Sequence, residues 1–543
     1  MKVFLALLET SGNQNFIFAT NRMRENVGAS ELVRLAGTRF VLESLPATRP
    51  LWDPDPAELR RRLADPLRNP PVENPDSPGI EILLATSGKA MALARRKEDA
   101  LELARQATLR ALLEAPGLEC SAVLQEFEWD QPGGLHRAVQ KAHENLESPE
   151  PPRGSGLLRF PRQPLFAPCD HSGRPACGTA RDGDRLLRLS RESLQKRNHA
   201  ESWIGRVHKL FPPDLRPPGN LWDLEKHLKE GDWLAVFHGD GNGFGSLFLN
   251  FQEYCGASSN RQYADRLRKF SQGLEHCAEE AFRGALAAAI HEKIVPLVLG
   301  GDDVTLIGEA RAVYQVAKVY LEKFEQQTAG CPDVSEIARN AFRTGSLSAS
   351  AGLAVVKPHF PFFEAYSLAE DLLRSAKDLR KDIPGGRGKS PPCSALDFHV
   401  VLDASVSNLE TIRRRLRVGD ARLTARPYLV GENLPSDWGR ARSLAELQNR
   451  AVLVRRGRKG DKGRPPELPS SQLHDLREGL FLGREAADAR LKLVLHRYPK
   501  LGELVEDGPE ISLFRRVEGR EWSWETRFLD ALDLADFLVP EAP

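Results

Sequence analysis

Two adjacent aspartates lie between apolar residues near the middle of the chain. The segment Gly300–Ile307 reads Gly-Gly-Asp-Asp-Val-Thr-Leu-Ile, and it follows the apolar segment Ile294–Leu299. Glycines and aspartates between two apolar segments are typical of a β-hairpin, and glycine permits the positive φ that a tight turn needs. The turn would expose the carboxylates of Asp302 and Asp303 at its tip. Carboxylate oxygens are ligands that Mg²⁺ and Mn²⁺ prefer, although Gly and Asp also occur in ordinary solvated turns.

A glycine-rich segment lies upstream of these aspartates. The apolar segment Trp233–Phe237 leads into His238–Gly245, which holds four glycines and a single carboxylate, Asp240. Glycine lets the backbone approach a ligand closely, and successive N–H groups can surround a phosphate. We expect Asp240 to lie close to Asp302 if its strand and the first strand of the hairpin are neighbours in one sheet. The segment alone is also typical of a glycine-rich turn without a ligand.

Three carboxylates beside such a loop suit a two-metal site for nucleotidyl transfer. One ion would activate a hydroxyl group and the other would stabilise a pyrophosphate leaving group, with the ions about 3.5–4 Å apart. The sequence therefore predicts an enzyme that binds two Mg²⁺ or Mn²⁺ ions through Asp240, Asp302 and Asp303.

The segments around the two motifs predict one α+β domain. Apolar residues that recur every three or four positions predict helices, and alternating apolar residues predict strands. In chain order we expect a strand at 232–238, a helix at about 261–291, a hairpin at 294–308, a helix at about 313–324, a strand at 346–356 and a helix at about 365–379. This βαββαβ order is that of the ferredoxin-like fold. Lys377 and Lys381 lie beside the apolar face of the last helix, where they either reach a triphosphate or belong to a solvated face.

The two motifs together resemble a known family of palm domains. Asp240–Gly245, with the sequence Asp-Gly-Asn-Gly-Phe-Gly, and Gly-Gly-Asp-Asp at Gly300–Asp303 are similar to the palm of the large subunit of type III CRISPR effector complexes, the Cas-ten or CRISPR polymerase family. That palm is related to the GGDEF diguanylate cyclases. The segments Asn15–Val33, Ala354–Pro361 and Ala369–Lys377 also resemble this family.

The resemblance implies a nucleotidyltransferase that makes cyclic oligoadenylate second messengers from ATP and releases pyrophosphate in antiviral defence. It implies activation by target RNA within a cytoplasmic, multi-subunit type III effector complex that also holds guide RNA. Metal binding and catalysis carry over to Asp240 and Asp302, with Asp303 in support. Nucleotide binding carries over to Gly241, Asn242, Gly243, Phe244, Gly245, Gly300, Gly301 and Lys377.

Two other functions stay open at this point. A catalytically silent scaffold subunit of an RNA-guided complex is one, and the intact carboxylates of both motifs argue against it. A stand-alone synthase of a cyclic dinucleotide is the other, and the long region after the palm argues against so small an enzyme. No residue pattern defines the base, the ring size or the linkage of the product.

The composition is that of a globular protein. A length of 543 residues suggests three or four domains of about 150 residues, and 41% of the residues are hydrophobic and 28% charged. No apolar segment approaches the ~18 residues of a membrane span, and Lys2–Leu8 suits a first strand better than a signal peptide. We therefore expect a cytoplasmic protein without membrane contact. The net charge of +1 means that any RNA contact depends on local basic patches.

Proline-rich segments divide the chain into four predicted units. They are a degenerate palm-like domain at 1–150, a connector at 151–230, the catalytic palm at 231–400 and a mostly helical domain at 401–543. The first unit repeats the ferredoxin-like order, with strands at 2–8, 81–86, 90–94 and 118–128 and helices at 29–36, 98–115 and 134–147. Its turn Thr86–Lys89 has no carboxylate. We expect this unit to face the catalytic palm and to help bind nucleotide, as paired palms do in the resembling family, and an unrelated αβ domain is the alternative.

The connector raises the question of zinc. Cys169, His171 and Cys177 lie close together in the sequence, but structural zinc needs four ligands, often from Cys-x₂₋₄-Cys pairs. The resembling family often has a cysteine-based finger in this region, and this chain departs from that pattern. We therefore expect a metal-free remnant of a zinc finger, with a zinc site as the alternative. Seven scattered cysteines also argue against a disulfide framework.

The last unit holds one basic patch and one amphipathic segment. Arg455–Arg464 is either a solvated loop or a contact for an RNA backbone. A strand is expected at 422–430, and Trp522–Leu538 predicts a helix whose apolar face is buried. In the resembling family a C-terminal helical domain contacts small subunits of the complex. Many members also begin with an HD-type nuclease, whereas here the first palm begins at Met1 and His474-Asp475 stands without further His or Asp clusters, so we expect no DNase activity.

Overall fold

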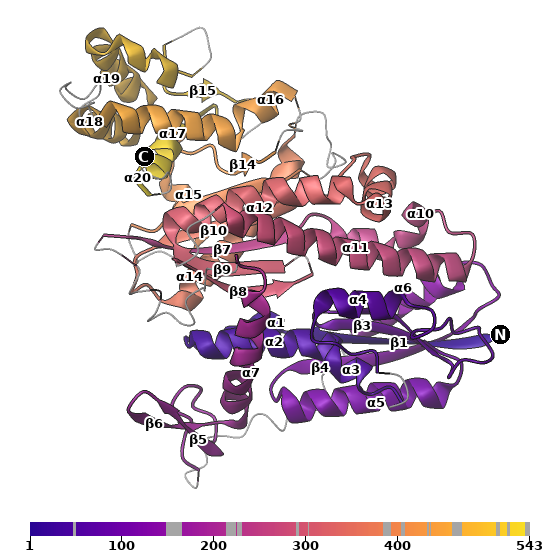
Figure 1. The fold of residues 1–543 in the computed structure, drawn as a ribbon. Helices are drawn as coiled ribbons and strands as arrows, with labels where there is room; N and C mark the ends of the chain where they lie inside the picture. Colours follow the sequence, from indigo (N-terminus) through magenta and orange to yellow (C-terminus); the bar gives the residue numbers. More distant parts are fainter. Residues whose placement is uncertain are drawn as a thin grey trace.

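The computed structural model places the two palms, the connector and the C-terminal region in one arrangement. It describes residues 1–46, 50–147, 166–212, 224, 228, 231–288, 293–301, 303–383, 393–402, 408–431, 434, 436–458, 470–506, 511–517 and 522–537. The fold is α+β, as predicted, and the second palm lies between the first palm and the C-terminal helices (Figure 1). Within the described residues, no helix has the length and apolar character needed to span a membrane.

The first palm is a four-stranded antiparallel sheet in the order β2-β3-β1-β4. Its elements are β1 (Lys2–Ser11), α1 (Asn13–Ile17), α2 (Met23–Gly37), α3 (Arg39–Leu42), α4 (Pro56–Ala64), β2 (Ile80–Thr86), β3 (Lys89–Ala94), α5 (Lys97–Glu114), β4 (Glu119–Glu128) and α6 (Gly134–Glu147). The central strand β1 pairs with β3 on one side and β4 on the other. This is the predicted ferredoxin-like order, and the structure adds the short helices α1, α3 and α4 and starts α2 earlier than expected.

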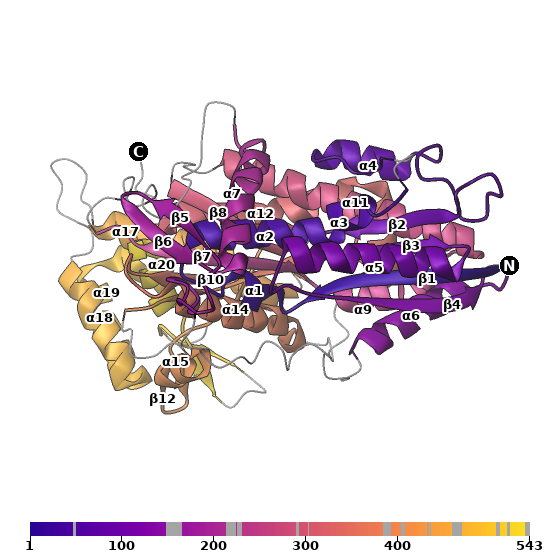
Figure 2. The ribbon, with the colours of Figure 1, turned by 90° about the horizontal axis from the view of Figure 1, so that it is seen from below.

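The connector consists of a two-stranded hairpin followed by a long helix. The hairpin pairs β5 (Gly178–Asp182) with β6 (Arg185–Leu189), and α7 (Arg191–His208) follows directly. Both views of the ribbon place α7 beside α2 of the first palm (Figures 1 and 2). The helices approach closely at Gly28, where a Cβ atom would lie 1.6 Å from the carbonyl oxygen of Lys196. A helix of this length was not predicted in the connector.

The second palm contributes most of a six-stranded sheet in the order β14-β11-β10-β7-β9-β8. Its elements are β7 (Leu234–Gly241), α9 (Phe244–Leu249), α10 (Phe251–Cys255), α11 (Asn260–Ala287), β8 (Ile294–Gly300), β9 (Asp303–Glu309), α12 (Ala310–Gly330), α13 (Pro332–Phe342), β10 (Ala349–Val356), α14 (Phe362–Asp378), the 3₁₀ helix η2 (Leu379–Asp382) and β11 (Ala395–Val400). The predicted strands and helices of this palm are present, and α9, α10, α13, η2 and β11 are additional.

One expectation about this sheet was wrong. The sequence predicts that the strand of Asp240 lies beside the first strand of the hairpin. Instead, β7 pairs with the second hairpin strand, β9, and the first hairpin strand, β8, lies at the edge of the sheet. The physical reason is the crossover through α11: in a ferredoxin-like sheet the two strands that a helix connects are parallel and leave room for one antiparallel strand between them. The second hairpin strand fills that place.

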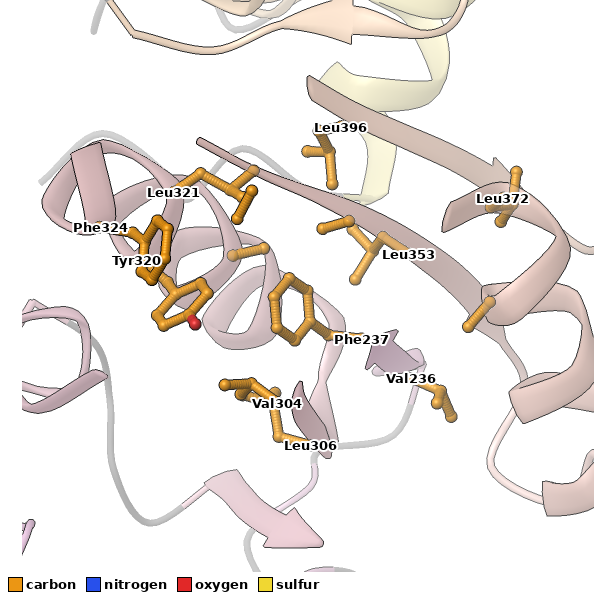
Figure 3. Packing of buried hydrophobic residues seen from close by; sticks show 14 of the residues in the cluster. Val236, Phe237, Val304, Leu306, Tyr320, Leu321, Phe324, Leu353, Leu372 and Leu396 are labelled. Atoms are coloured by element: carbon orange, nitrogen blue, oxygen red, sulfur yellow. The ribbon is translucent and has the colours of Figure 1, made fainter. Parts of the chain in front are cut away.

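The core of the second palm explains why its strands are apolar on both faces. Phe237 on β7 points toward Tyr320 on α12, with ring centroids 6.2 Å apart, whereas its neighbour Val236 points to the opposite face (Figure 3). Successive side chains of a strand alternate between faces, and here α12 covers one face and α14 the other. On β10, Gly352 lets α14 approach, because a Cβ atom there would lie 1.9 Å from the Ala369 carbonyl oxygen.

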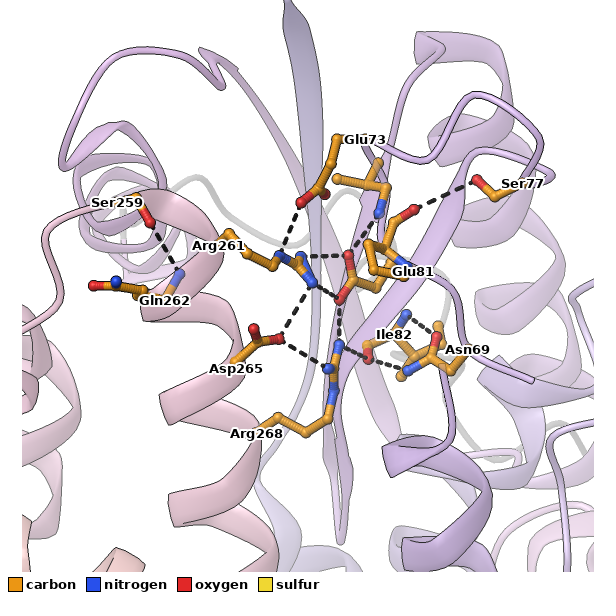
Figure 4. Close-up of polar contacts among 12 residues, drawn as sticks. Asn69, Glu73, Ser77, Glu81, Ile82, Ser259, Arg261, Gln262, Asp265 and Arg268 are labelled. Atoms are coloured by element: carbon orange, nitrogen blue, oxygen red, sulfur yellow. Dashed lines mark hydrogen bonds and ion pairs between the residues drawn. The ribbon is translucent and has the colours of Figure 1, made fainter. Parts of the chain in front are cut away.

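Buried ion pairs join the first palm to the second. Glu81 on β2 is fully buried and accepts hydrogen bonds from Arg261 and Arg268, which both lie on α11 (Figure 4). The Arg261 Nη2 atom lies 2.7 Å from Glu81 Oε2, and its Nε atom lies 3.1 Å from Glu73 Oε1. Because the charges on both sides of this contact are paired, the two palms pack with little uncompensated charge between them.

The C-terminal region is mostly helical, as predicted, but it also contains a small sheet. Its elements are α15 (Leu409–Arg415), β12 (Arg417–Val418), β13 (Ala421–Arg422), β14 (Tyr428–Leu429), α16 (Ser436–Ala441), α17 (Leu444–Arg458), α18 (Ser470–Leu482), α19 (Arg484–Arg497), the 3₁₀ helix η3 (Pro499–Leu504), β15 (Arg515–Arg516), β16 (Trp524–Glu525) and α20 (Phe528–Phe537). Strands β12, β13, β16 and β15 form the small sheet in that order, and β14 joins the palm sheet through β11.

Two expectations for this region need correction. The predicted strand at 422–430 is two short strands, β13 and β14, in different sheets. The predicted helix Trp522–Leu538 begins only at Phe528, because Trp524 and Glu525 pair in β16; its apolar face is buried, as expected, and Leu538 lies outside the described residues. In the predicted basic patch, residues 455–458 end α17, and 459–464 lie outside the described residues.

Candidate active site

The strand register brings two of the predicted carboxylates together. Strand β7 pairs with β9 in antiparallel register as far as Gly239 opposite Val304, so the next pair is Asp240 opposite Asp303. Asp240 therefore lies at the end of β7 and Asp303 at the start of β9, both beside the turn of the hairpin. Asp302, the third predicted carboxylate, lies outside the described residues.

Of the two candidate lysines, the structure brings one to these carboxylates. The Lys377 ammonium on α14 forms an ion pair and a hydrogen bond with Asp240 Oδ2. Lys381 instead pairs with Asp378 at 2.5 Å, and its side chain is 59% exposed. Lys377 is thus the cation in direct contact with the site, whereas Lys381 belongs to the solvated surface.

The two carboxylates influence each other's protonation. Burial between the palms, followed by the charge of Asp240 and a hydrogen bond to it, raises the pKa of Asp303 to about 7, and Lys377 acts in the opposite direction. Because the side chain of Asp303 is also exposed to solvent, repulsion from the Asp240 carboxylate is an important cause of this raised pKa. A divalent cation between the two groups would relieve this repulsion, and hard carboxylate oxygens suit Mg²⁺ or Mn²⁺.

The glycine-rich loop is shorter than predicted. Gly241 still belongs to β7, Gly243 has a positive φ of 75°, and α9 begins at Phe244. The side chain of Asn242 is buried: its amide donates to Ser348 Oγ at 3.0 Å and to the Cys393 carbonyl at 2.8 Å. Asn242 therefore anchors the loop to the palm through its side chain, and its backbone N–H also donates to the Ser348 carbonyl at 3.0 Å.

A cavity of about 320 Å³ lies between the two palms beside these groups. The second palm lines it with Phe244, Gly245, Gly300, Gly301 and Asp303, and the first palm lines it with Phe18, Thr86, Ser87, Lys89 and His143, among others. The two turns meet here, because a Cβ atom on Gly300 would lie 2.6 Å from the side chain of Ser87. The turn of the first palm thus contributes to the cavity without contributing a carboxylate.

Four further residues that the sequence did not identify line the site. His238 Nδ1 lies 2.9 Å from Thr305 Oγ1, and the imidazole packs against Tyr366 with ring centroids 5.3 Å apart. Burial lowers the pKa of His238 to about 4, so the imidazole is neutral at pH 7. Side-chain alternation along a strand could have found His238, two residues before Asp240, and Thr305, two residues after Asp303; Tyr366 gave no signal. Tyr263 also lines the cavity, and its buried hydroxyl has no hydrogen-bond partner among the described residues.

The three zinc candidates of the connector do not come together. His171 is buried against Glu25, whereas Cys177 is exposed. Among the described residues, which include these three but not Asp302, no group of three or more His, Cys, Asp or Glu side chains has a metal-binding arrangement.

Comparisons with known proteins agree with this geometry. Residues 233–383 match the family model of the second palm domain of Cas10/Cmr2. The fold is similar to the crystal structure of Csm1 from T. onnurineus, with a TM-score of 0.51 and 16% identity over 98% of this chain and 68% of that chain. It is also similar to a Csm1–Csm4 cassette crystallised with pppApA, with a TM-score of 0.52 and 14% identity over 99% of this chain and 70% of that chain. No curated protein matches the sequence. Residues 233–383 therefore match the second palm domain of Cas10/Cmr2, and the fold of the chain is similar to that of Csm1.

Proposed function

We propose that this protein is a metal-dependent nucleotidyltransferase that makes cyclic oligoadenylates from ATP. The observation that carries the proposal is the placement of Asp240 opposite Asp303, with Lys377 in contact, at a cavity between two palms. The family of the second palm supports it. The pppApA bound to the similar Csm1–Csm4 cassette is a short linear oligoadenylate, which is the kind of intermediate that such a reaction would form.

In this proposal the 3′-hydroxyl of one nucleotide attacks the α-phosphorus of the next. A new P–O bond forms, the bond between the α-phosphorus and the bridging oxygen breaks, and pyrophosphate leaves while the hydroxyl loses its proton. Asp240, Asp302 and Asp303 would hold the divalent cations, which when bound supply an activated hydroxyl and stabilise the leaving group.

The other residues of the site would bind and orient the nucleotides. The Lys377 ammonium would share its contact with Asp240 and also bind phosphate oxygens, since a Lys ammonium is a common phosphate ligand. The backbone at residues 241–245 and at Gly300 and Gly301 would approach the phosphates closely, because five of these residues are glycines, which have no Cβ atom. The apolar walls of the cavity would hold the base.

We further propose that the protein works in a type III effector complex with guide RNA and target RNA. Similarity to a chain from a Csm1–Csm4 cassette supports a partner subunit. The net charge of +1 argues that RNA would be bound together with such partners, because the chain as a whole is not basic.

The test is an incubation of the purified protein with ATP and Mg²⁺ or Mn²⁺, with and without co-expressed partner subunits and target RNA. Products are identified by mass spectrometry. Asp240→Asn and Asp303→Asn should each abolish the product. Asp371→Asn is the matched control, because that carboxylate pairs with Arg374 on the surface of α14 and should leave the product unchanged.

Two results would contradict the proposal. One is the absence of product under every condition from protein that is folded and assembled with its partners, which would favour a scaffold. The other is a product whose yield does not change in the Asp240→Asn and Asp303→Asn variants.

A further inference from the structure

Four small side chains meet at the base of the connector hairpin. Cys169 and Ser172 precede the hairpin β5–β6, and Ser190 and Ser193 follow it. Cys169 Sγ lies 3.7 Å from Ser193 Oγ, and Ser172 Oγ lies 3.4 Å from Ser190 Oγ. Cys169, Ser190 and Ser193 are buried, with at most 4% of their surface exposed. We call these four residues the connector tetrad.

The spacing of the tetrad is that of a zinc site. Structural zinc takes four ligands, often as two pairs of cysteines with two residues between the members of a pair. Cys169 and Ser172 have two residues between them, and so do Ser190 and Ser193. The hairpin between the pairs brings them together in space, so that Cys169 contacts Ser193 and Ser172 contacts Ser190.

The chemistry of the tetrad does not fit zinc. Zinc in proteins is bound by thiolate, imidazole and carboxylate groups, and three of the four positions here carry a neutral hydroxyl. The cysteine finger that the family resemblance implies for this region is therefore not matched by the residues present. Hydrogen bonds among the four side chains take the place of metal–ligand bonds.

We propose that the connector has the backbone of a zinc-binding unit in which a hydrogen-bonded Cys-Ser-Ser-Ser tetrad has replaced the metal. The backbone supports this reading: the Ser172 amide donates to Cys169 Sγ at 3.4 Å, and the Ser193 amide donates to Ser190 Oγ at 3.2 Å. Burial acts to raise the pKa of Cys169, but hydrogen bonds from Ser172 and other neighbours lower it to about 6. A thiolate at this position would be the acceptor for the surrounding donors.

The tetrad is tied to the first palm through Glu25. Ser193 Oγ donates to Glu25 Oε2 at 3.2 Å, and His171 contacts the other oxygen of the same buried carboxylate. One turn further along α7, Lys196 Nζ donates to the Phe16 carbonyl at 2.6 Å. Phe16 belongs to the segment that places Phe18 in the wall of the cavity, against Tyr366. The tetrad thus fixes α7 against a wall of the candidate active site without needing a metal.

The test restores the missing ligands in the full-length chain. The triple variant Ser172→Cys, Ser190→Cys and Ser193→Cys should bind one Zn²⁺ per chain by metal analysis. After exchange with Co²⁺ it should give the intense visible absorption of tetrahedral thiolate coordination. Adding Cys169→Ser should abolish that spectrum, whereas adding Cys177→Ser should leave it unchanged, because Cys177 is exposed and outside the tetrad. The wild-type protein should contain no stoichiometric zinc.

Several results would overturn the proposal. Stoichiometric zinc in the wild-type protein, removed by a chelator with a fall in thermal stability, is one. A folded triple variant that binds no metal, or one whose Co²⁺ spectrum depends on Cys177, is another. If the triple variant does not fold, the proposal is tested on the wild-type protein. Its melting temperature should not change with a strong chelator or with added Zn²⁺. A clear change with either would contradict the proposal. These measurements do not depend on nucleotide synthesis.

Discussion

Lys377 is the cation that balances the carboxylates of the second palm. It contacts Asp240, which in turn faces Asp303, so its ammonium group lies beside the two acidic side chains of this site that the structure describes. A bound triphosphate would bring negative charge beside Lys377, and its metal ions would bring positive charge beside the carboxylates. The ammonium can then exchange one anionic partner for another with little change in its surroundings, which suits a residue that acts on phosphate.

This arrangement predicts different effects for the two lysines near the end of α14. Lys377→Met should lower the rate of product formation by about 10²-fold, the typical cost of removing one group that stabilises charge in a transition state. Lys381→Met should leave the rate close to that of the wild type, because among the described residues Lys381 pairs with Asp378 at the surface. Initial rates at saturating ATP measure the effect, and equal losses in both variants would contradict the assigned difference.

The sequence identified the charged side chains that meet at the candidate site better than the contacts that support them. Asp240, Asp303 and Lys377 were selected by residue type and spacing, and the fold places all three together. Strand alternation places His238 and Thr305 on the same face as the aspartates, but their contact with each other depends on the pairing of β7 with β9, which no local pattern specifies. Asn242 was expected at the ligand because it lies among glycines, but three hydrogen-bonding partners in the palm hold its side chain.

At the scale of elements, the contact between α2 and α7 is the tightest place where the connector meets a palm. Gly28→Ala should lower the free energy of unfolding by about 1–3 kcal/mol, since its Cβ atom would overlap the Lys196 carbonyl and force the helices apart. Gly205→Ala, on the same helix α7, has no atom within 4 Å of its Cβ position. It should raise the free energy of unfolding by about 0.5–1 kcal/mol.

Thermal unfolding of the two alanine variants tests this contact. Shifts of opposite sign are expected. A Gly28→Ala variant as stable as the wild type would mean that α7 does not pack on α2 as described.

Strand β11 carries a histidine that makes stability depend on pH. Burial, followed by the positive charges of Arg426 and Arg413, lowers the pKa of His399 well below its ordinary value of 6.5. The unfolded chain therefore takes up a proton on this residue at a higher pH than the folded chain does. The stability associated with neutral His399 is fully present above pH 6.5 and is lost as the pH falls below it.

His399→Gln should remove that part of the pH dependence. The free energy of unfolding of the wild type should fall more steeply than that of the variant between about pH 6.5 and about pH 5. Urea unfolding at several pH values gives the comparison. Parallel curves for the two proteins would show that His399 is not held neutral by its surroundings.

Sequence periodicity located the elements of both palms, but it could not order them in the sheet. The apolar patterns of β7, α11, β8 and β9 are local properties, and they were found at nearly their observed bounds. Which hairpin strand pairs with β7 is decided by the crossover of α11, a tertiary property. The short strands β12 to β16 were missed or merged because two paired residues leave no measurable alternation.

At the scale of the whole molecule, the pairing of the palms rests in part on Glu81. Glu81→Gln should lower the free energy of unfolding by about 1–3 kcal/mol, because it removes the anion shared by the part-buried Arg261 and Arg268. Glu102→Gln is the control: Glu102 pairs with Arg105 on the exposed surface of α5, so its loss should change stability very little. The melting temperatures of the two variants make the comparison, and similar shifts would contradict the role given to Glu81.

The cavity between the palms is asymmetric, because the two turns that meet there differ in sequence. Thr86–Lys89 and the turn that begins at Gly300 meet at one cavity, but only the second contains acidic residues. Two nucleotides bound there would occupy inequivalent positions, and bond formation would take place at one of them. Under the proposed function an oligomer would therefore lengthen from one end only, and it would have to shift across the cavity after each addition before its two ends could close into a ring.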